Sequence, residues 1–318
     1  MSRIHEALKR AEQERAASQG GRVDSAPVMD LPASPEPLPG MAEAADATRT
    51  APTAPIPGAP GNGQKVPSFA TSFTFDTLLA RSAQADWKPD PTTMLFFSQE
   101  DNALGTEQFR TLRSRLYQLR EKISLKKILI TSALPQEGKS FVAANLAQVL
   151  VRQHGRRVLL IDGDLRVARL HTALGTTSSP GLADYLLGES DEFSIMQRGP
   201  MENLFFLPCG RTVAHPAELI ANGRLKMLLQ RVEPLFDWII LDSPPAVPVS
   251  DASQLANFCD GVLMVVRSNA TPYDTAQKAR QEFQGKTLVG VVLNGITRGD
   301  SYSRYYYEAY EKTAKPKA

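Results

Sequence analysis

Short apolar runs alternate with amphipathic stretches between residues 102 and 294. Each run is almost continuously apolar, which is typical of strands that are covered on both faces of a parallel sheet. The predicted strands are 128–130, 157–164, 203–208, 238–242, 261–267 and 288–294. The predicted helices are 102–122, 141–154, 181–187, 216–232, 251–258 and 272–284. This alternation indicates a doubly wound α/β domain with a mostly parallel sheet, in which ligands bind at the carboxyl ends of the strands.

The first part of the chain lacks this alternation. Residues 2–15 carry apolar side chains at helical spacing, which predicts a short amphipathic helix. We interpret this helix as a docking segment for a partner protein or a lipid surface, or as a helix that packs on its own domain. Residues 18–67 contain ten prolines in fifty positions and keep no hydrophobic periodicity. Such a segment buries too little apolar surface to offset the entropy of ordering, so we expect a flexible tether.

These patterns divide the chain into four parts. The expected parts are an amphipathic helix at 1–17, a Pro/Ala-rich flexible linker at 18–90, a folded domain at 91–300 and a tail at 301–318. The fold class is therefore a doubly wound α/β domain preceded by a disordered N-terminal region.

The composition narrows the class of protein. Lysine and arginine together number 36 against 34 aspartates and glutamates, which argues against a protein that coats duplex nucleic acid. No apolar run is long enough to span a bilayer, and residues 1–17 lack the apolar core of a signal peptide. We therefore expect a cytoplasmic protein that does not bind nucleic acid.

The loop after the strand at 128–130 carries the strongest chemical signal. It reads Ala133-x-x-x-x-Gly138-Lys139-Ser140 and leads into a predicted helix, which is the context of a phosphate-binding loop. Backbone N–H groups of the loop and the positive end of the helix would cradle a polyphosphate. Lys139 would reach the β- and γ-phosphates of ATP, and the Ser140 hydroxyl would bind Mg²⁺. The residues predicted to contact ATP are Ala133, Pro135, Gln136, Glu137, Gly138, Lys139, Ser140, Phe141 and, at a strand end suited to reading a purine edge, Asn294.

Three aspartates follow two of the predicted strands. Asp162 and Asp164 are two residues apart, so both could face a bound nucleotide from the same side of a strand. Asp242 follows four apolar residues, a pattern of the Walker B kind. Because Mg²⁺ prefers a few carboxylates together with phosphate oxygens, we assign Asp164 and Asp242 to the metal, beside Ser140. Asp162 is then left to accept a proton from an attacking hydroxyl, and Lys139 completes the expected catalytic set.

The tail is rich in tyrosine. Five of the chain's eight tyrosines lie there, interleaved with serine, arginine, glutamate and lysine near a terminus. This composition favours a substrate for modification over a packed aromatic cluster. The predicted phosphorylation sites are Tyr302, Tyr305, Tyr306, Tyr307 and Tyr310.

The predicted helix at 102–122 carries three charges at intervals of three residues, namely Glu107, Arg110 and Arg113. On spacing alone, we interpret these residues as a solvated helix face with ion pairs within the helix.

From about residue 104 to residue 310, the chain closely resembles the bacterial tyrosine kinases, or BY-kinases, of capsule and exopolysaccharide systems. The resemblance rests on the phosphate loop, on Asp162-x-Asp164-x-Arg166, which is the Walker A′ motif of that family, and on the Asp242-Ser243-Pro244-Pro245 stretch. It also includes the stretches 180–182, 250–252 and 290–294 and the tyrosine cluster. One departure is Val167-Ala168 after Arg166, where many relatives carry a basic residue and proline.

The resemblance implies an ATP- and Mg²⁺-dependent protein-tyrosine autokinase with the fold of the phosphate-loop NTPases of the MinD/ParA type. It assigns Glu107, Arg110 and Arg113 to self-assembly into a ring, in which the tail of one subunit is phosphorylated in the active site of a neighbour. It further implies control of polysaccharide polymerisation and export. The implied partners are a separate inner-membrane polysaccharide co-polymerase, which recruits and activates the kinase at the membrane, and a cognate tyrosine phosphatase.

Two other functions share some of these motifs. A nucleotide-switched positioning ATPase of the MinD/ParA class would have the same phosphate loop, acidic strand ends and fold. Those proteins carry a signature lysine early in the loop, where this chain has Ala133-Leu134-Pro135, and they lack a tyrosine cluster. A catalytically idle scaffold in a polysaccharide assembly complex would not need the intact catalytic motifs.

Overall fold

The computed structural model describes residues 73–97 and 105–296. The helices are α2 (Phe75–Arg81), α3 (Thr106–Arg120), α4 (Lys139–Val151), α5 (Leu170–Leu174), α6 (Leu182–Leu187), α7 (Pro216–Ala221), α8 (Arg224–Val232), the 3₁₀ helix η1 (Glu233–Leu235), α9 (Asp251–Ala256) and α10 (Tyr273–Gln281). The strands are β1 (Ala83–Gln84), β2 (Lys127–Ser132), β3 (Val158–Asp162), β4 (Gln197–Arg198), β5 (Leu204–Leu207), β6 (Trp238–Asp242), β7 (Gly261–Arg267) and β8 (Leu288–Asn294). The predicted helix at 1–17, the proline-rich part of the linker and the tyrosine tail lie outside the described residues.

The strands form one sheet in the order β1-β4-β5-β3-β6-β2-β7-β8. All neighbours from β5 to β8 in this order are parallel, whereas β4 is antiparallel to β5. The central strands β3 and β6 are buried along their whole length, because both of their faces are covered. The doubly wound, mostly parallel sheet predicted from the sequence is confirmed.

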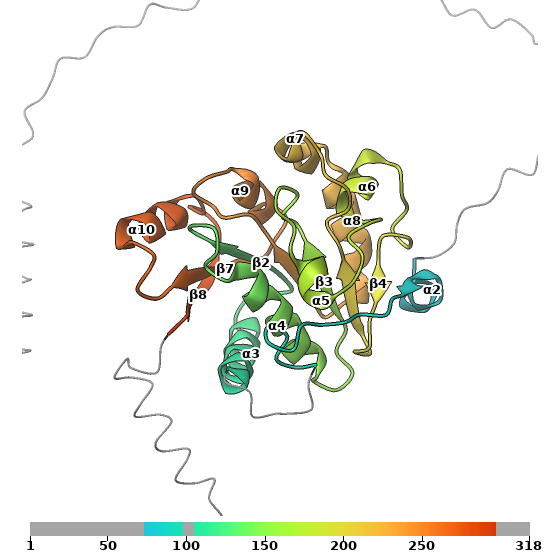
Figure 1. Ribbon diagram of the computed structural model, residues 1–318, viewed down its shortest axis with the longest axis horizontal. Coiled ribbons are helices and arrows are strands. Elements are labelled where there is room, and N and C mark those ends of the chain that lie inside the picture. Colours follow the sequence, from blue (N-terminus) through green and yellow to red (C-terminus); the bar gives the residue numbers. More distant parts are fainter. Residues whose placement is uncertain (1–72, 98–104, 297–318) are drawn as a thin grey trace, which may run out of the picture. The chain divides into compact units, whose positions relative to one another are not determined.

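Helices cover both faces of this sheet (Figure 1). Helices α3, α4 and α5 lie on one face, and α6 to α10 lie on the other. Successive side chains of a strand point to opposite faces, so Ile128 and Ile130 of β2 pack in the α3 to α5 layer while Leu129 packs in the other. Because β2 runs parallel to its neighbours β6 and β7, the loop from β2 to α4 lies at the carboxyl edge of the sheet, where the phosphate site is expected.

Two differences from the predicted elements have local causes. The predicted helix at 216–232 is two helices, because Gly223 has a left-handed φ of 83° that separates α7 from α8. The side chain of Asn222 stabilises this break by accepting the Arg224 N–H at 3.0 Å. The sequence pattern does not predict α5, β1 or β4, since elements of five and two residues are too short to show a period. Across the described ranges, no helix combines the length and the apolar character needed to cross a membrane.

Residues 73–97, called the strap below, are folded on the domain, whereas the sequence predicts a flexible linker as far as residue 90. Helix α2 of the strap buries Leu78 completely, and Phe75 packs edge-on against Phe205 at a centroid distance of 5.6 Å. Strand β1 then pairs with β4 at the edge of the sheet. The boundary at residue 90 is wrong, because apolar side chains of the strap contribute to the core of the domain.

Three polar side chains, two in α4 and one from the residue that caps its C-terminus, hold the end of the strap. Asn145 donates to the Thr93 carbonyl at 2.8 Å, and Gln148 accepts the Phe96 N–H at 3.3 Å. Arg152 donates to the Phe96 carbonyl at 2.6 Å. The three residues are spaced along one side of the helix. The strap is thus bonded to the same helix that begins at the phosphate loop.

Candidate active site

The phosphate loop turns tightly between β2 and α4. Ala133 is buried at its start, whereas Pro135 and Gln136 are exposed at its tip. Gly138 has a φ of 96°, in the left-handed region that favours glycine. A Cβ atom at Gly138 would lie 2.0 Å from Nδ2 of Asn294, so no larger residue fits without rearrangement. No side chain caps the start of α4 by a hydrogen bond, so its first N–H groups are suited to an anion.

The side chain of Glu137 points into the domain and holds the loop in place. It is 3% exposed. Its Oε2 accepts the backbone N–H of Leu134 at 2.7 Å, and its Oε1 accepts the Thr271 hydroxyl. Thr271 lies after β7, so this carboxylate connects two strand ends. Of the predicted ATP contacts, Glu137 therefore has only its backbone available for a nucleotide in this conformation.

Replacing Glu137 by alanine is expected to lower the free energy of unfolding by about 1–3 kcal/mol, because buried donors lose their acceptor. The affinity for a fluorescent ATP analogue should fall as well, since the loop is no longer held. Urea unfolding and fluorescence titration measure the two effects. Glu137→Gln keeps an acceptor and should lose less of both, whereas wild-type stability of Glu137→Ala would contradict the role of the carboxylate.

Lys139 lies among the predicted carboxylates. Its Nζ is 2.9 Å from Oδ2 of Asp164 and 3.7 Å from Oδ2 of Asp242. The Ser140 hydroxyl donates to the same Asp242 oxygen at 2.6 Å. The register of β3 and β6 sets Asp162 beside Asp242. The structure thus brings together five residues that are spread over 104 positions of the sequence.

Burial controls the charges of this cluster. It raises the pKa of Asp162 to about 8, and the neighbouring Asp242 adds to the shift. Burial raises the pKa of Asp242 as well. At Lys139, burial acts to lower the pKa, but the carboxylates of Asp242 and Asp164 outweigh it and leave that pKa raised. The site therefore holds a charged Lys139 beside Asp162, a carboxylate that binds a proton more readily than an ordinary aspartate does.

The two aspartates after β3 differ in position. Asp164 faces Lys139, as expected of a residue on the phosphate side. Asp162 is completely buried, and its two oxygens accept the backbone N–H groups of Asp164 at 3.3 Å and Leu170 at 3.2 Å. Each oxygen keeps a free lone pair, but because Asp162 is completely buried, an incoming hydroxyl would reach it only after the surrounding residues move. Catalytic hydrogen bonds often form only in the substrate complex, so this geometry is compatible with the predicted base.

The donor set of the cluster fits Mg²⁺ bound with a polyphosphate. Oδ1 of Asp242 is buried and has no hydrogen-bond partner among the described residues. A carboxylate oxygen of this kind, beside the Ser140 hydroxyl, suits a hard cation. In the described part of the chain, no group of three or more His, Cys, Asp or Glu residues could hold a metal. Phosphate oxygens and water would therefore complete the coordination.

The side chains of two further residues that are predicted to contact ATP pack or bond against other parts of the protein. Asn294 donates its amide to the Glu137 carbonyl at 2.9 Å, which places it against the phosphate loop. Its contact with a purine edge stays a prediction. Phe141 packs edge-on against Phe109 of α3 with ring centroids 5.8 Å apart. The first turn of α4 is thus packed directly on α3.

The three charged residues predicted to lie on one face of α3 make two kinds of contact. Glu107 and Arg110 form the ion pair within the helix that their spacing predicts. Arg113 donates to the Val149 carbonyl at 3.0 Å, which anchors α3 on α4. A role of the three residues in self-assembly stays a prediction.

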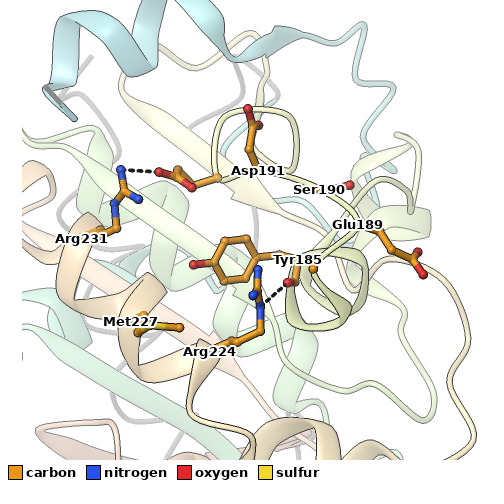
Figure 2. A pocket seen from close by; sticks show the side chains of 9 residues that line it. Tyr185, Glu189, Ser190, Asp191, Arg224, Met227 and Arg231 are labelled. Carbon is orange, nitrogen blue, oxygen red and sulfur yellow. Dashed lines mark hydrogen bonds and ion pairs between the residues drawn. The ribbon is translucent and has the colours of Figure 1, made fainter. Parts of the chain in front are cut away.

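A pocket of about 480 Å³ lies between α6, the loop at 188–192 and α8 (Figure 2). Arg231 forms an ion pair with Glu192 at 2.5 Å. Arg224 stacks 5.0 Å from the ring centroid of Tyr185 and donates to the Tyr185 carbonyl at 2.9 Å. None of the lining residues belongs to the phosphate loop or to the strand ends that carry the aspartates. This pocket is therefore separate from the candidate active site.

Comparison with known sequences agrees with this geometry. A family model described as an AAA domain matches residues 126–278. The tyrosine-protein kinase YwqD of Bacillus subtilis is 36% identical over 210 residues, which cover 65% of this chain and 88% of that protein. The putative tyrosine-protein kinase EpsB of Ralstonia nicotianae is 33% identical over 221 residues, which cover 67% of this chain and 29% of that protein. The chain thus spans less than a third of this longer relative.

Solved structures give the same result. The kinase domain of the Escherichia coli tyrosine kinase ETK has a TM-score of 0.61 at 28% identity, over 65% of this chain and 82% of that one. The chimerical protein CapA2B2 has a TM-score of 0.60 at 28% identity, over 69% of this chain and 96% of that one. With a phosphate loop, a lysine and three aspartates assembled at one sheet edge, the chain belongs to the family of bacterial tyrosine-protein kinases.

Proposed function

We propose that this chain is an ATP- and Mg²⁺-dependent autokinase that phosphorylates its C-terminal tyrosine cluster in trans. The observation that carries the proposal is the contact of Lys139 with Asp164 and Asp242, beside the Ser140 hydroxyl. Phosphoryl transfer needs positioning and charge neutralisation more than covalent chemistry, and this set of groups supplies both.

Each residue of the cluster has a role in the proposed reaction. Lys139 leaves Asp164 and binds the β- and γ-phosphates, while Ser140, Asp164 and Asp242 would hold Mg²⁺. Bound Mg²⁺ would neutralise charge on the transferred group. Asp162, in its ionised form, accepts the proton of the tyrosine hydroxyl. The phenolic oxygen bonds to the γ-phosphorus, and the bond from that phosphorus to the ADP oxygen breaks.

The composition of the tail supports it as the acceptor. Five tyrosines lie between residues 302 and 310, in a segment that also carries lysine and arginine. Each phosphate adds about −1.5 to −2 charges, so a multiply phosphorylated tail would be repelled by the acidic clusters of neighbouring subunits. Phosphorylation would then loosen the proposed ring, in which Glu107, Arg110 and Arg113 make the contact between subunits.

One relative supports a cellular role. A protein of Klebsiella pneumoniae, 30% identical over 207 residues, is described as a putative tyrosine-protein kinase in a cps region. By extension, this chain would regulate the polymerisation and export of a capsular or extracellular polysaccharide. A separate polysaccharide co-polymerase would recruit it to the inner membrane and activate it, and a tyrosine phosphatase would reverse the modification.

The proposal is tested by incubating the purified full chain with Mg-ATP, alone and with the cytoplasmic segment of a candidate membrane partner. Mass spectrometry of the C-terminal peptide should find phosphate on Tyr302, Tyr305, Tyr306, Tyr307 or Tyr310. For transfer in trans, a Lys139→Met chain is mixed with an active chain whose five tail tyrosines are phenylalanine. Phosphate on the tail of the Lys139→Met chain is expected. ATP turnover with an unmodified tail would point instead to a positioning ATPase.

A further inference from the structure

Asp251 is a buried carboxylate to which the proposed reaction gives no role. It is the first residue of α9 and is 0% exposed. Arg166, in the turn after β3, contacts it at two points: Nε donates to Oδ2 at 2.7 Å, and Nη2 donates to Oδ1 at 2.9 Å. A buried carboxylate is costly unless it is paired and fully hydrogen-bonded, and this two-point contact meets that requirement.

The pair is linked to a predicted catalytic carboxylate. The backbone N–H of Arg166 donates to Oδ1 of Asp164 at 3.3 Å, and the N–H of Val167 donates to the same oxygen at 2.9 Å. The other oxygen of Asp164 lies 2.9 Å from Nζ of Lys139. A continuous series of contacts therefore runs from Asp251 through Arg166 and Asp164 to Lys139.

The pair also joins the turns after two neighbouring strands. Arg166 follows β3, and Asp251 follows β6, the strand that ends in Asp242. Between them, the Gly163 N–H donates to the Asp242 carbonyl at 2.9 Å. A Cβ atom at Gly163 would lie 2.6 Å from that oxygen, so the two turns are in close backbone contact there. The Arg166 side chain provides the second connection, further from the strands.

We propose that Asp251 and Arg166 are positioning residues of the phosphoryl-transfer site, because they fix the two backbone N–H groups that orient Asp164. The inference rests on the proposed function and deepens it. When Lys139 turns from Asp164 to a phosphate, that carboxylate loses its cation and keeps the two N–H groups. Without the contact to Asp251, the main chain at Arg166 would no longer be held, and Asp164 would be less well oriented for Mg²⁺.

The test compares Asp251→Asn and Arg166→Lys with the wild type in the full chain. Asparagine keeps the size of the side chain but loses its charge, and lysine keeps the charge but loses the two-point contact. Each variant should slow tail phosphorylation at saturating ATP by about 10- to 100-fold. Each should also raise, by a similar factor, the Mg²⁺ concentration that gives half-maximal binding of a fluorescent ATP analogue. The double variant should be no slower than the slower single variant, because both changes break one contact.

Glu192→Gln is the matched control. The Arg231–Glu192 pair, whose arginine is labelled in Figure 2, has side chains 48% and 11% exposed, against 39% and 0% for Arg166 and Asp251. It lies at the pocket of α6 and α8, so its loss should change neither the rate nor the Mg²⁺ dependence.

Unchanged Mg²⁺ dependence in Arg166→Lys and Asp251→Asn, or losses that add in the double variant, would overturn the inference. If Asp251→Asn does not fold, Arg166→Lys, at a partly exposed position, decides alone. If the wild type binds the nucleotide but transfers no phosphate, the proposed function fails, and the Mg²⁺ dependence of binding still decides the role of the pair.

Discussion

Replacing Lys139 by methionine is expected to slow tail phosphorylation at least about 100-fold, the usual effect of removing one preorganised group that stabilises developing charge. The Lys139 ammonium already lies 2.9 Å from Asp164 and 3.7 Å from Asp242, at the edge where the phosphates are expected. Methionine keeps much of the length and packing of the side chain but removes the charge. Quantitative mass spectrometry of the C-terminal peptide over time measures the rate. Labelling at the wild-type rate would contradict the assignment.

Lys127→Met is the matched control for this experiment. Lys127 begins β2, at the opposite end of the strand from the phosphate loop, and contacts Glu233 at 2.5 Å and Asp260 at 3.2 Å. Its side chain is 13% exposed, against 11% for Lys139. We expect Lys127→Met to be less stable but to phosphorylate at the wild-type rate once folded. Equal loss of rate in both variants would attribute the effect to folding rather than to the site.

Asp162→Asn is expected to slow tail phosphorylation by a factor as large as that of Lys139→Met or larger. A general base contributes about 100- to 10,000-fold, and asparagine cannot accept the tyrosine proton. ATP binding should change much less, because Asp162 is completely buried and, among the ion pairs of the described residues, Lys139 pairs with Asp164 and Asp242 instead. Rate and nucleotide affinity, measured on the same preparation, separate the two effects.

The same substitution should flatten the dependence of stability on pH in the free protein. Burial raises the pKa of Asp162 from its ordinary 3.8 to about 8. Between these values the native state holds a proton that the unfolded state has lost. The free energy of unfolding therefore falls as the pH rises, by up to about 1.4 kcal/mol per pH unit. The contribution is fully present below pH 3.8 and is lost as the pH passes about 8.

Urea unfolding across this pH range, on wild type and Asp162→Asn without nucleotide, measures that difference. Asparagine does not titrate, so the variant lacks this part of the slope. Asp86→Asn is the control, since the Asp86 side chain is 89% exposed. Parallel curves for wild type and Asp162→Asn would show that Asp162 holds no proton in the native state.

Three strands could be predicted to the residue, because a polar side chain ends each apolar run. Predicted strands at 238–242, 261–267 and 288–294 coincide with β6, β7 and β8, whose apolar runs end at Asp242, Arg267 and Asn294. The break between α7 and α8 could not be predicted. The hydrophobic period continues across residues 216–232, and only the left-handed backbone at Gly223 separates the two helices. Residues 73–90 of the strap fall in the predicted linker, because their apolar side chains are too irregularly spaced to indicate an element.

The residues of the candidate site could also be predicted only in part. Lys139, Ser140 and the three aspartates could be predicted, because each follows a strand in a recognisable local motif. The contacts that hold these residues could not. Glu137 and Thr271 are 134 positions apart, and Arg166 and Asp251 are 85 apart. Such pairs depend on which strands become neighbours, and no local pattern in one sequence contains that information.

The strap also protects the domain against aggregation with other copies of itself. Strand β1 occupies the hydrogen-bonding edge of β4, and Trp87 packs edge-on against the fully buried Phe206 at 6.0 Å. A fragment trimmed at residue 91, the predicted boundary, would lack both. Its open strand edge and uncovered aromatic rings would favour strand exchange and aggregation between molecules. One short strand and one tryptophan of the strap thus close the edge of the sheet at β4 against pairing with another molecule.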